Sequence, residues 1–155
     1  MMKSYLIDGN NLMGKISPIK KAQNKDKQAA REKLVILIEK YFMVRKGKVY
    51  IHFDGFQNTP ISFSKGKIIY SEKYKADKQI KDQIEATKNR RNLIVVSSDH
   101  EIQDFAKACS CDILSSEKFA QDLTSKKNVN EEEKKIKEIN NVEEFKKLFG
   151  ANNQG

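Results

Sequence analysis

The sequence predicts a single three-layer α/β domain, in which helices cover both faces of a central, mainly parallel sheet. Short apolar runs alternate along the chain with segments whose apolar residues recur at helical spacing, which is typical of α/β proteins. The apolar runs are continuous and do not alternate with polar residues, which indicates strands that are buried on both faces. A length of 155 residues fits one compact domain.

The predicted strands are short. The clearest is Leu93-Ile94-Val95-Val96, which is uninterrupted and mainly β-branched, and the segment 68–70 is placed at an edge of the sheet. Right-handed crossovers between parallel strands bring all the carboxyl ends to one edge of the sheet, where α/β proteins bind ligands. In chain order, the strands are expected at 4–7, 48–53, 68–70, 93–96 and 112–114.

Four helices are expected between and after these strands. The first spans 26–45 with Asp26 as its cap, and the second spans 77–88 with only a thin apolar stripe. A third helix follows Ser97-Ser98, and a fourth is capped by Ser115 or Ser116. The apolar faces of these two helices carry Ile102, Phe105, Ala106 and Cys109 in the third, and Phe119, Ala120 and Leu123 in the fourth.

The composition changes near residue 124, and we expect three parts in the chain. Residues 1–124 form the α/β domain, and residues 125–150 form a helical extension that packs on it. Within the extension, Asn130 and Asn141 each begin a segment that resembles the capping box of a short helix. Residues 151–155 are expected to be a disordered tail.

The charge of the chain is positive and unevenly distributed. The net formal charge is +9, and residues 15–48 hold eleven Lys and Arg against three acidic residues, a balance of +8. A basic segment of this kind suits a polyanionic substrate that is held by its phosphates. A surface that is rich in lysine for other reasons gives the same count, so the charge leaves both interpretations open.

The sequence favours a cytoplasmic protein without a membrane partner. No apolar stretch approaches the ~20 residues of a membrane-spanning helix, and no signal-peptide pattern precedes the first strand. Cys109 and Cys111 lie too close together for an ordinary structural disulfide, which indicates a reducing compartment.

Aspartates recur where strands end or helices begin. Asp8, in Asp8-Gly9-Asn10-Asn11, directly follows the first strand, whereas Asp77 and Asp99 come at helix starts. Carboxylates gathered at one sheet edge repel one another, and two unit charges 4 Å apart cost about 4 kcal/mol at an effective dielectric constant near 20. Such a cluster needs a cation, so the pattern predicts a Mg²⁺ or Mn²⁺ site.

Each of these aspartates also has an ordinary structural interpretation. Asp8-Gly9 and Asp54-Gly55 both resemble turns, although no partner strand follows the first of them. Asp77 and Asp99 sit where an N-cap is expected, and aspartate is a favoured cap. The purely structural interpretation is weaker for the set as a whole, because separate elements deliver aspartate to the same predicted edge.

Neighbouring polar residues have two roles open to them. Asn11 is expected either to bond the backbone of its own turn or to orient Asp8 or a metal-bound water. Ser97 and Ser98 are either small residues at a crowded strand end or hydrogen-bond donors to the carboxylates.

Other chemistries lack their motifs in this sequence. There is no glycine-rich phosphate-binding loop, no nucleophile elbow and no second cysteine pair for a structural zinc ion. His52 and His100 have no ligand spacing around them, so we expect His52 to be a packed strand residue and His100 a surface residue at a helix start.

Four short motifs follow one another along the chain: Tyr5-Leu6-Ile7-Asp8-Gly9-Asn10-Asn11, Ile51-His52-Phe53-Asp54-Gly55, Ala76-Asp77-Lys78-Gln79-Ile80 and Val95-Val96-Ser97-Ser98-Asp99. In this order they resemble the motifs of NYN domains, most closely the YacP-like bacterial branch of the PIN-like nuclease superfamily. The resemblance covers about residues 3–124, and Gln103 and the stretch 114–119 are similar as well.

This resemblance implies a metal-dependent endoribonuclease on a Rossmann-like sheet. By analogy with the family, the residues matching Asp8, Asp77 and Asp99 hold one or two Mg²⁺ or Mn²⁺ ions. Asn11 and Ser97 or Ser98 support them, and Asp54 is a candidate additional acid. Lys78 and Lys81 stand where some nucleases have a further acid, which is a departure from a complete two-metal site.

Single-stranded RNA is the preferred substrate by the same analogy. The main alternative is a catalytically inactive module that binds RNA or the ribosome, and a second alternative is a hydrolase of small phosphoesters. Basic residues would contact the phosphates and fix position more than sequence. The candidate RNA contacts are Lys15, Lys20, Lys21, Arg31, Arg90 and Arg91.

Overall fold

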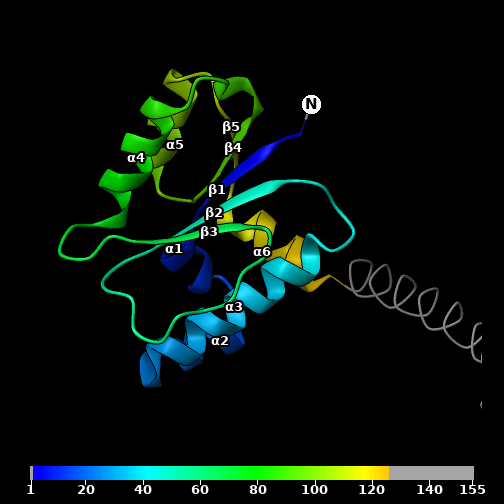
Figure 1. The fold of residues 1–155 in the computed structure, drawn as a ribbon, viewed down its shortest axis with the longest axis vertical. Coiled ribbons are helices and arrows are strands. Elements are labelled where there is room, and N and C mark those ends of the chain that lie inside the picture. The colour runs from blue at the N-terminus through cyan, green and yellow to red at the C-terminus, as the bar shows by residue number, and fades with distance from the viewer. Residues whose placement is uncertain (1, 126–155) are drawn as a thin grey trace, which may run out of the picture.

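The computed structural model describes residues 2–125, which form three layers around one parallel sheet (Figure 1). The sheet has five strands in the order β3-β2-β1-β4-β5, and every neighbouring pair is parallel. The predicted fold class is therefore confirmed. The strands are β1 (Ser4–Asp8), β2 (Lys48–Phe53), β3 (Gly66–Tyr70), β4 (Leu93–Val96) and β5 (Asp112–Leu114).

Helices cover both faces of the sheet. In Figure 1, α4 and α5 lie on one side, and α1, α2, α3 and α6 lie on the other. A short 3₁₀ helix, η1 (Arg90–Asn92), leads into β4. The α-helices are α1 (Gly9–Met13), α2 (Ser17–Lys25), α3 (Lys27–Tyr41), α4 (Ala76–Ala86), α5 (His100–Ala108) and α6 (Ser116–Thr124).

The core lies on both sides of the central strand. Leu6 is fully buried in the cluster formed with α4 and α5, and the next residue, Ile7, is fully buried in the cluster formed with α3. Successive side chains of a strand point to opposite faces, so a strand between two helical layers needs apolar residues at consecutive positions. This is the physical reason for the continuous apolar runs in the sequence.

The parallel register sets where the polar side chains gather. β1 pairs with β2 on one side and with β4 on the other, and Asp8 lies opposite His52. Asp54 directly follows β2, and Asp99 follows β4 after two serines. All three aspartates are therefore at the carboxyl edge of the sheet.

The segment 9–25 differs from the prediction, which placed no helix there. It forms α1 and α2, but α1 has only five residues and α2 buries only Ile19. The buried apolar residues of this segment are divided between two short helices, so neither helix alone carries a long periodic pattern. The helix predicted over 26–45 is present but ends at Tyr41. The two helices predicted beyond residue 125, and the predicted tail, lie outside the described residues.

Both histidines lie where the sequence placed them. His52 is 2% exposed in β2, and its Nε2 lies 2.7 Å from Gln83 Oε1. His100 is exposed at the first residue of α5. Over the described part of the chain, no helix has the length and apolar character needed to cross a lipid bilayer.

Gly9 links β1 to α1 where the backbone is most crowded. A Cβ atom added there would lie 2.6 Å from the His52 carbonyl oxygen and 2.7 Å from the Phe53 ring. We expect Gly9→Ala to lower the free energy of unfolding by about 1–3 kcal/mol, because the clash is with backbone. Chemical denaturation would measure this loss.

Gly14→Ala is the matched control for this prediction. Gly14 has helical backbone angles, and an added Cβ would meet its nearest atom at an ordinary 3.5 Å. We expect this variant to be as stable as wild type, or up to about 1 kcal/mol more stable. Equal effects of the two substitutions would contradict the assigned packing at Gly9.

Candidate active site at the carboxyl edge of the sheet

A cleft of about 590 Å³ opens at the carboxyl edge of the sheet. Four aspartates from four separate segments line it: Asp8, Asp54, Asp77 and Asp99. The structure thus brings together the three aspartates proposed as metal ligands and the candidate additional acid. The remaining lining residues are Asn10, Asn11, Tyr74, Lys75, Ala76 and Ile102.

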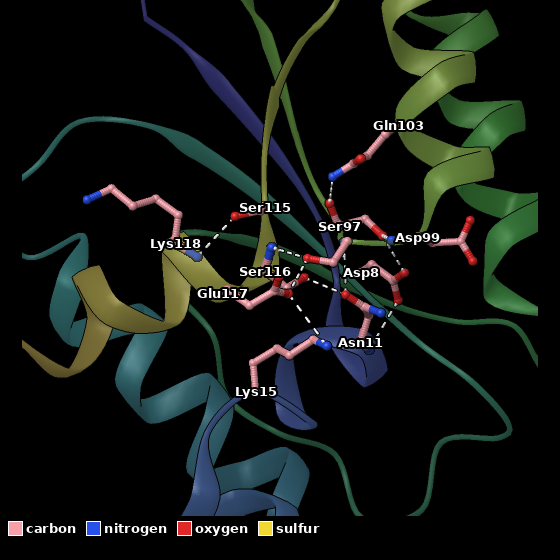
Figure 2. A network of polar contacts seen from close by, with 11 residues as sticks. Asp8, Asn11, Lys15, Ser97, Asp99, Gln103, Ser115, Ser116, Glu117 and Lys118 are labelled. Carbon is pink, nitrogen blue, oxygen red and sulfur yellow. Dashed lines mark hydrogen bonds and ion pairs between the residues drawn. The ribbon is translucent and has the colours of Figure 1, made fainter.

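Asp8 is the buried member of the set, with an exposed fraction of 9%. Ser97 Oγ donates a hydrogen bond to its Oδ2 at 3.0 Å, and the Asn11 N–H donates to its Oδ1 at 3.4 Å (Figure 2). The pKa of Asp8 is raised to about 6, mainly by burial and to a smaller extent by the charges of Asp54 and Asp99, which together outweigh these two hydrogen bonds. The carboxylate is held in place but is left short of compensating positive charge.

Asp54 belongs to the site and is not merely part of a turn. Its Oδ1 accepts a hydrogen bond from the Ala76 N–H at 2.8 Å, so it caps α4 from a different segment. Lys75, the formal N-cap of α4, makes no side-chain capping bond. The Asp54 N–H in turn donates to Asn10 Oδ1 at 2.8 Å, which ties the loop after β2 to α1.

Asp99 and Asp77 are held at the starts of α5 and α4. Asp99 is the N-cap of α5 and accepts from the Ile102 N–H at 3.1 Å, so its structural interpretation and its place in the cleft both hold. Asp77 is not a cap, because α4 already begins at Ala76. It lies half-buried in the first helical turn, where the helix dipole favours a carboxylate.

Asn11 joins three segments through its side-chain oxygen. That oxygen accepts from the Ser98 N–H at 3.0 Å and from Ser116 Oγ at 2.6 Å. The bond from residue 11 to Asp8 comes from the backbone, so the Asn11 side chain itself fixes α1 against the loop after β4 and the start of α6. Figure 2 shows this arrangement, in which Gln103 also donates to the Ser97 carbonyl oxygen at 2.8 Å.

Ser98 extends the network to a fifth acidic residue. Its hydroxyl donates to Glu117 Oε1 and accepts from the Ser116 N–H at 2.9 Å. Lys15 Nζ lies 3.5 Å from Glu117 Oε1 (Figure 2). The hydrogen bond from Ser98 lowers the pKa of Glu117, and Lys15 lowers it further. Ser98 therefore bonds Glu117, and the serine that bonds an aspartate of the cleft is Ser97.

Lys78 and Lys81, which stand where some nucleases have a further acid, form ion pairs around α4. Lys81 Nζ lies 2.9 Å from Glu101 Oε1, which raises the pKa of Lys81 together with the nearby charges of Asp77 and Asp99. Lys78 pairs with Asp82 at 3.2 Å on the exposed side of the helix.

The candidate RNA contacts are divided between different places. Lys15 lies beside the network through Glu117, and Lys20 and Lys21 are exposed on α2. Arg90 and Arg91 belong to η1, which precedes β4, so they lie at the opposite edge of the sheet from the aspartates. These two arginines therefore cannot contact a phosphate bound in the cleft, and their role as RNA contacts elsewhere along a strand stays a prediction.

The structure contradicts the prediction that Arg31 contacts RNA. It is 2% exposed, and its guanidinium donates to the Phe56 carbonyl oxygen at 2.9 Å and to the Asp54 carbonyl oxygen at 2.5 Å. The guanidinium carbon also lies 5.4 Å from the centre of the Phe53 ring. Arg31 is thus a structural residue that holds the loop carrying Asp54.

The donors of the cleft fit a hard divalent cation in chemical type. They are carboxylate and amide oxygens, which Mg²⁺ and Mn²⁺ prefer. Burial, with a smaller contribution from the charges of Asp54 and Asp99, raises the pKa of Asp8. Within the part of the chain that the structure describes, no three Asp, Glu, His or Cys side chains converge closely enough to ligate one ion together. A cation here would therefore be held partly through water, as Mg²⁺ commonly is.

Sequence reasoning missed Asn10, Ser116 and Glu117 as parts of the site. Asn10 was visible beside Asp8, but its partner is a backbone N–H from a distant segment. Ser116 is predicted only as a cap or as part of the family-like stretch 114–119, and the cap of α6 is Ser115. The bonds of Ser116 and Glu117 to residues near 98 depend on how β5 and α6 pack, for which the sequence gives no local signal.

The parallel sheet and the cleft lined by four aspartates define an α/β domain with an acidic candidate site at its carboxyl edge. The model of the YacP-like NYN domain matches residues 5–151, and the chain belongs to this family. No curated protein matches it in sequence.

Two solved structures share the fold. The crystal structure of Rae1 (YacP) from Bacillus subtilis matches with a TM-score of 0.78 and 18% identity, over 95% of this chain and 87% of that one. The W164L mutant of the same protein matches with a TM-score of 0.73 and 20% identity, over 90% and 85% of the two chains.

The raised pKa of Asp8 makes the stability of the metal-free protein dependent on pH. Its pKa is higher in the fold, at about 6, than the ordinary value of 3.8, so the stability that it contributes is complete below about pH 3.8 and is lost as the pH rises through 6. We expect Asp8→Asn, in EDTA, to gain on the order of 3 kcal/mol over wild type between about pH 4 and pH 8. Urea denaturation at several pH values measures this difference.

Asp82→Asn is the control for this titration. Asp82 is exposed on α4 and pairs only with Lys78 among the contacts described. The free energy of unfolding of this variant should follow that of wild type across the same pH range. If the difference in free energy of unfolding between Asp8→Asn and wild type stays constant with pH, the raised pKa of Asp8 is refuted.

Proposed function

We propose that this protein is a metal-dependent endoribonuclease that hydrolyses RNA phosphodiester bonds at the cleft on the carboxyl edge of the sheet. The observation that supports this most is the convergence of four aspartates, from four separate segments, on one cleft. Membership of the YacP-like NYN family, whose domains are nuclease-like, agrees with it. The cleft is an open surface feature with exposed residues such as Asp54 and Asp99, so a phosphate within a long strand can reach it.

Asp8, Asp77 and Asp99 would hold Mg²⁺ or Mn²⁺, with Asp54 as an additional acid. The bound ion would lower the pKa of a water molecule and stabilise charge on the phosphate. In the chain itself, Ser97 and the Asn11 N–H fix both oxygens of Asp8. The pKa of Asp8 is about 6, so below that pH its carboxylate requires nearby positive charge to be fully ionised.

The hydrogen-bonded supports keep the aspartates in place before substrate binds. Asn11 and Gln103 immobilise the loop that carries Ser97 and Asp99, and Asn10 immobilises the loop that carries Asp54. Groups that are preorganised in this way cost no reorganisation at the moment of reaction. Lys15, Lys20 and Lys21 would contact the RNA backbone outside the cleft, where their positive charges attract phosphates.

Cleavage of circular single-stranded RNA, with Mg²⁺ or Mn²⁺ and with EDTA, tests this function, because only an endonuclease can cut a circle. We expect Asp77→Asn to reduce the rate by about 10²–10³-fold, since a metal ion supplies several kcal/mol to the transition state. Asp82→Asn, on the same helix but paired with Lys78 outside the cleft, should cut at the wild-type rate.

The alternative is an RNA- or ribosome-binding module without activity. Binding of RNA without metal-dependent cleavage, together with equal behaviour of Asp77→Asn and Asp82→Asn, would support that alternative and refute the nuclease.

A further inference from the structure

Two aromatic side chains are exposed on the loops beside the cleft. Tyr74 is 56% exposed and lines the cleft, and Phe56 is 62% exposed on the loop after β2. Single exposed apolar residues are common on proteins and need no explanation. Among the described residues, however, the large hydrophobic side chains that are both aromatic and exposed all lie at this one edge of the sheet. The other exposed members of that group are Met2, Ile36 and Met43.

The backbones that carry the two rings are bonded to each other. The Gly55 N–H donates to Ser71 Oγ at 3.0 Å, and the Glu72 N–H donates to the Gly55 carbonyl oxygen at 2.8 Å. Glu72 has a φ of 61°, in the left-handed region, so the chain turns sharply before Tyr74. The loops after β2 and β3 therefore form one unit that carries both Phe56 and Tyr74.

Buried Arg31 makes this unit rigid. It donates to the carbonyl oxygens of Asp54 and Phe56, and its guanidinium carbon lies 5.0 Å from the centre of the Tyr70 ring. A surface that is already ordered loses little conformational entropy when a ligand binds. The rings of Phe56 and Tyr74 are thus displayed from a fixed backbone.

Positive charge accompanies the rings. Lys73 and Lys75 flank Tyr74 in sequence and are exposed, and Lys73 Nζ lies 5.5 Å from the centre of the Tyr74 ring. Lys75 lines the cleft together with Tyr74. Aromatic faces beside ammonium groups bind single-stranded nucleic acid, because the rings stack on bases while the charges hold phosphates. In a duplex the bases are stacked on one another and are not free to do this.

We propose that Phe56 and Tyr74 form a stacking platform for unpaired bases next to the phosphate held in the cleft. The platform makes single-stranded RNA the ligand of this site in preference to a duplex. This inference rests on the proposed function for its choice of RNA, but it does not depend on cleavage.

The chain contains no tryptophan, so a tryptophan introduced at either position is the sole reporter of its kind. We expect the fluorescence of Phe56→Trp and of Tyr74→Trp to be quenched when single-stranded RNA binds in EDTA, because a stacked base quenches the indole. The same RNA annealed to its complement should leave both unquenched. Met43→Trp is the control, since Met43 is exposed ahead of β2, at the opposite edge of the sheet.

Affinity at several salt concentrations gives a second readout. Replacing both rings by serine should weaken the binding of single-stranded RNA by about tenfold or more. The slope of log affinity against log salt should not change, because no charge is removed. Lys75→Ala should instead reduce that slope by about 0.7, the value for one phosphate contact on a single strand.

The outcomes separate this inference from the proposed function. RNA binding without quenching at positions 56 and 74, or unchanged affinity without the rings, overturns the platform even if wild type cleaves RNA. Quenching with single strands, when no cleavage is found with Mg²⁺ or Mn²⁺, supports the platform while the nuclease fails. Equal quenching by duplex and single strand, or no RNA binding at all, also overturns the platform.

Discussion

The parallel pairing of β1 with both of its neighbours is the constraint on which the rest of this structure depends. It fixes the register in which Asp8 ends the central strand opposite His52, so that the segments after β2 and β4 begin at the same edge. Helices packed on both faces then bury Leu6 and Ile7 on opposite sides and leave Asp8 only 9% exposed. A carboxylate in this position has lost most of its hydration, and its raised pKa is the direct result.

The polar supports around Asp8 connect stability with the proposed chemistry. Asp54 and Asp99 each cap a helix and also line the cleft, so each carboxylate both satisfies a backbone N–H group and borders the space where a cation would bind. The side chains of Asn10 and Asn11 bind partners from distant segments and hold the loops in register. The carboxylates that line the cleft repel one another, and a bound cation would relieve that repulsion.

Arg31 shows how far charge count can mislead. It lies in the basic segment 15–48, but it is buried beneath the loops after β2 and β3 and bonds the carbonyl oxygens of Asp54 and Phe56. Those bonds fix the backbone that displays Asp54 to the cleft and Phe56 to solvent. Arg90 and Arg91 lie away from the cleft, since their place ahead of β4 puts them at the far edge of a parallel sheet.

The sequence by itself determined the fold class, the five strands and the gathering of four aspartates at one edge of the sheet. Buried parallel strands need continuous apolar runs, and each run ends where polar residues begin. Only the tertiary structure decided the positions of α1 and α2, the burial of Arg31, and the network through Asn11, Ser116 and Glu117. An apolar pattern that is divided between two short helices leaves only a weak periodic signal in each. Contacts between residues a hundred positions apart leave no local signal, since they arise from the way in which separate elements pack against one another.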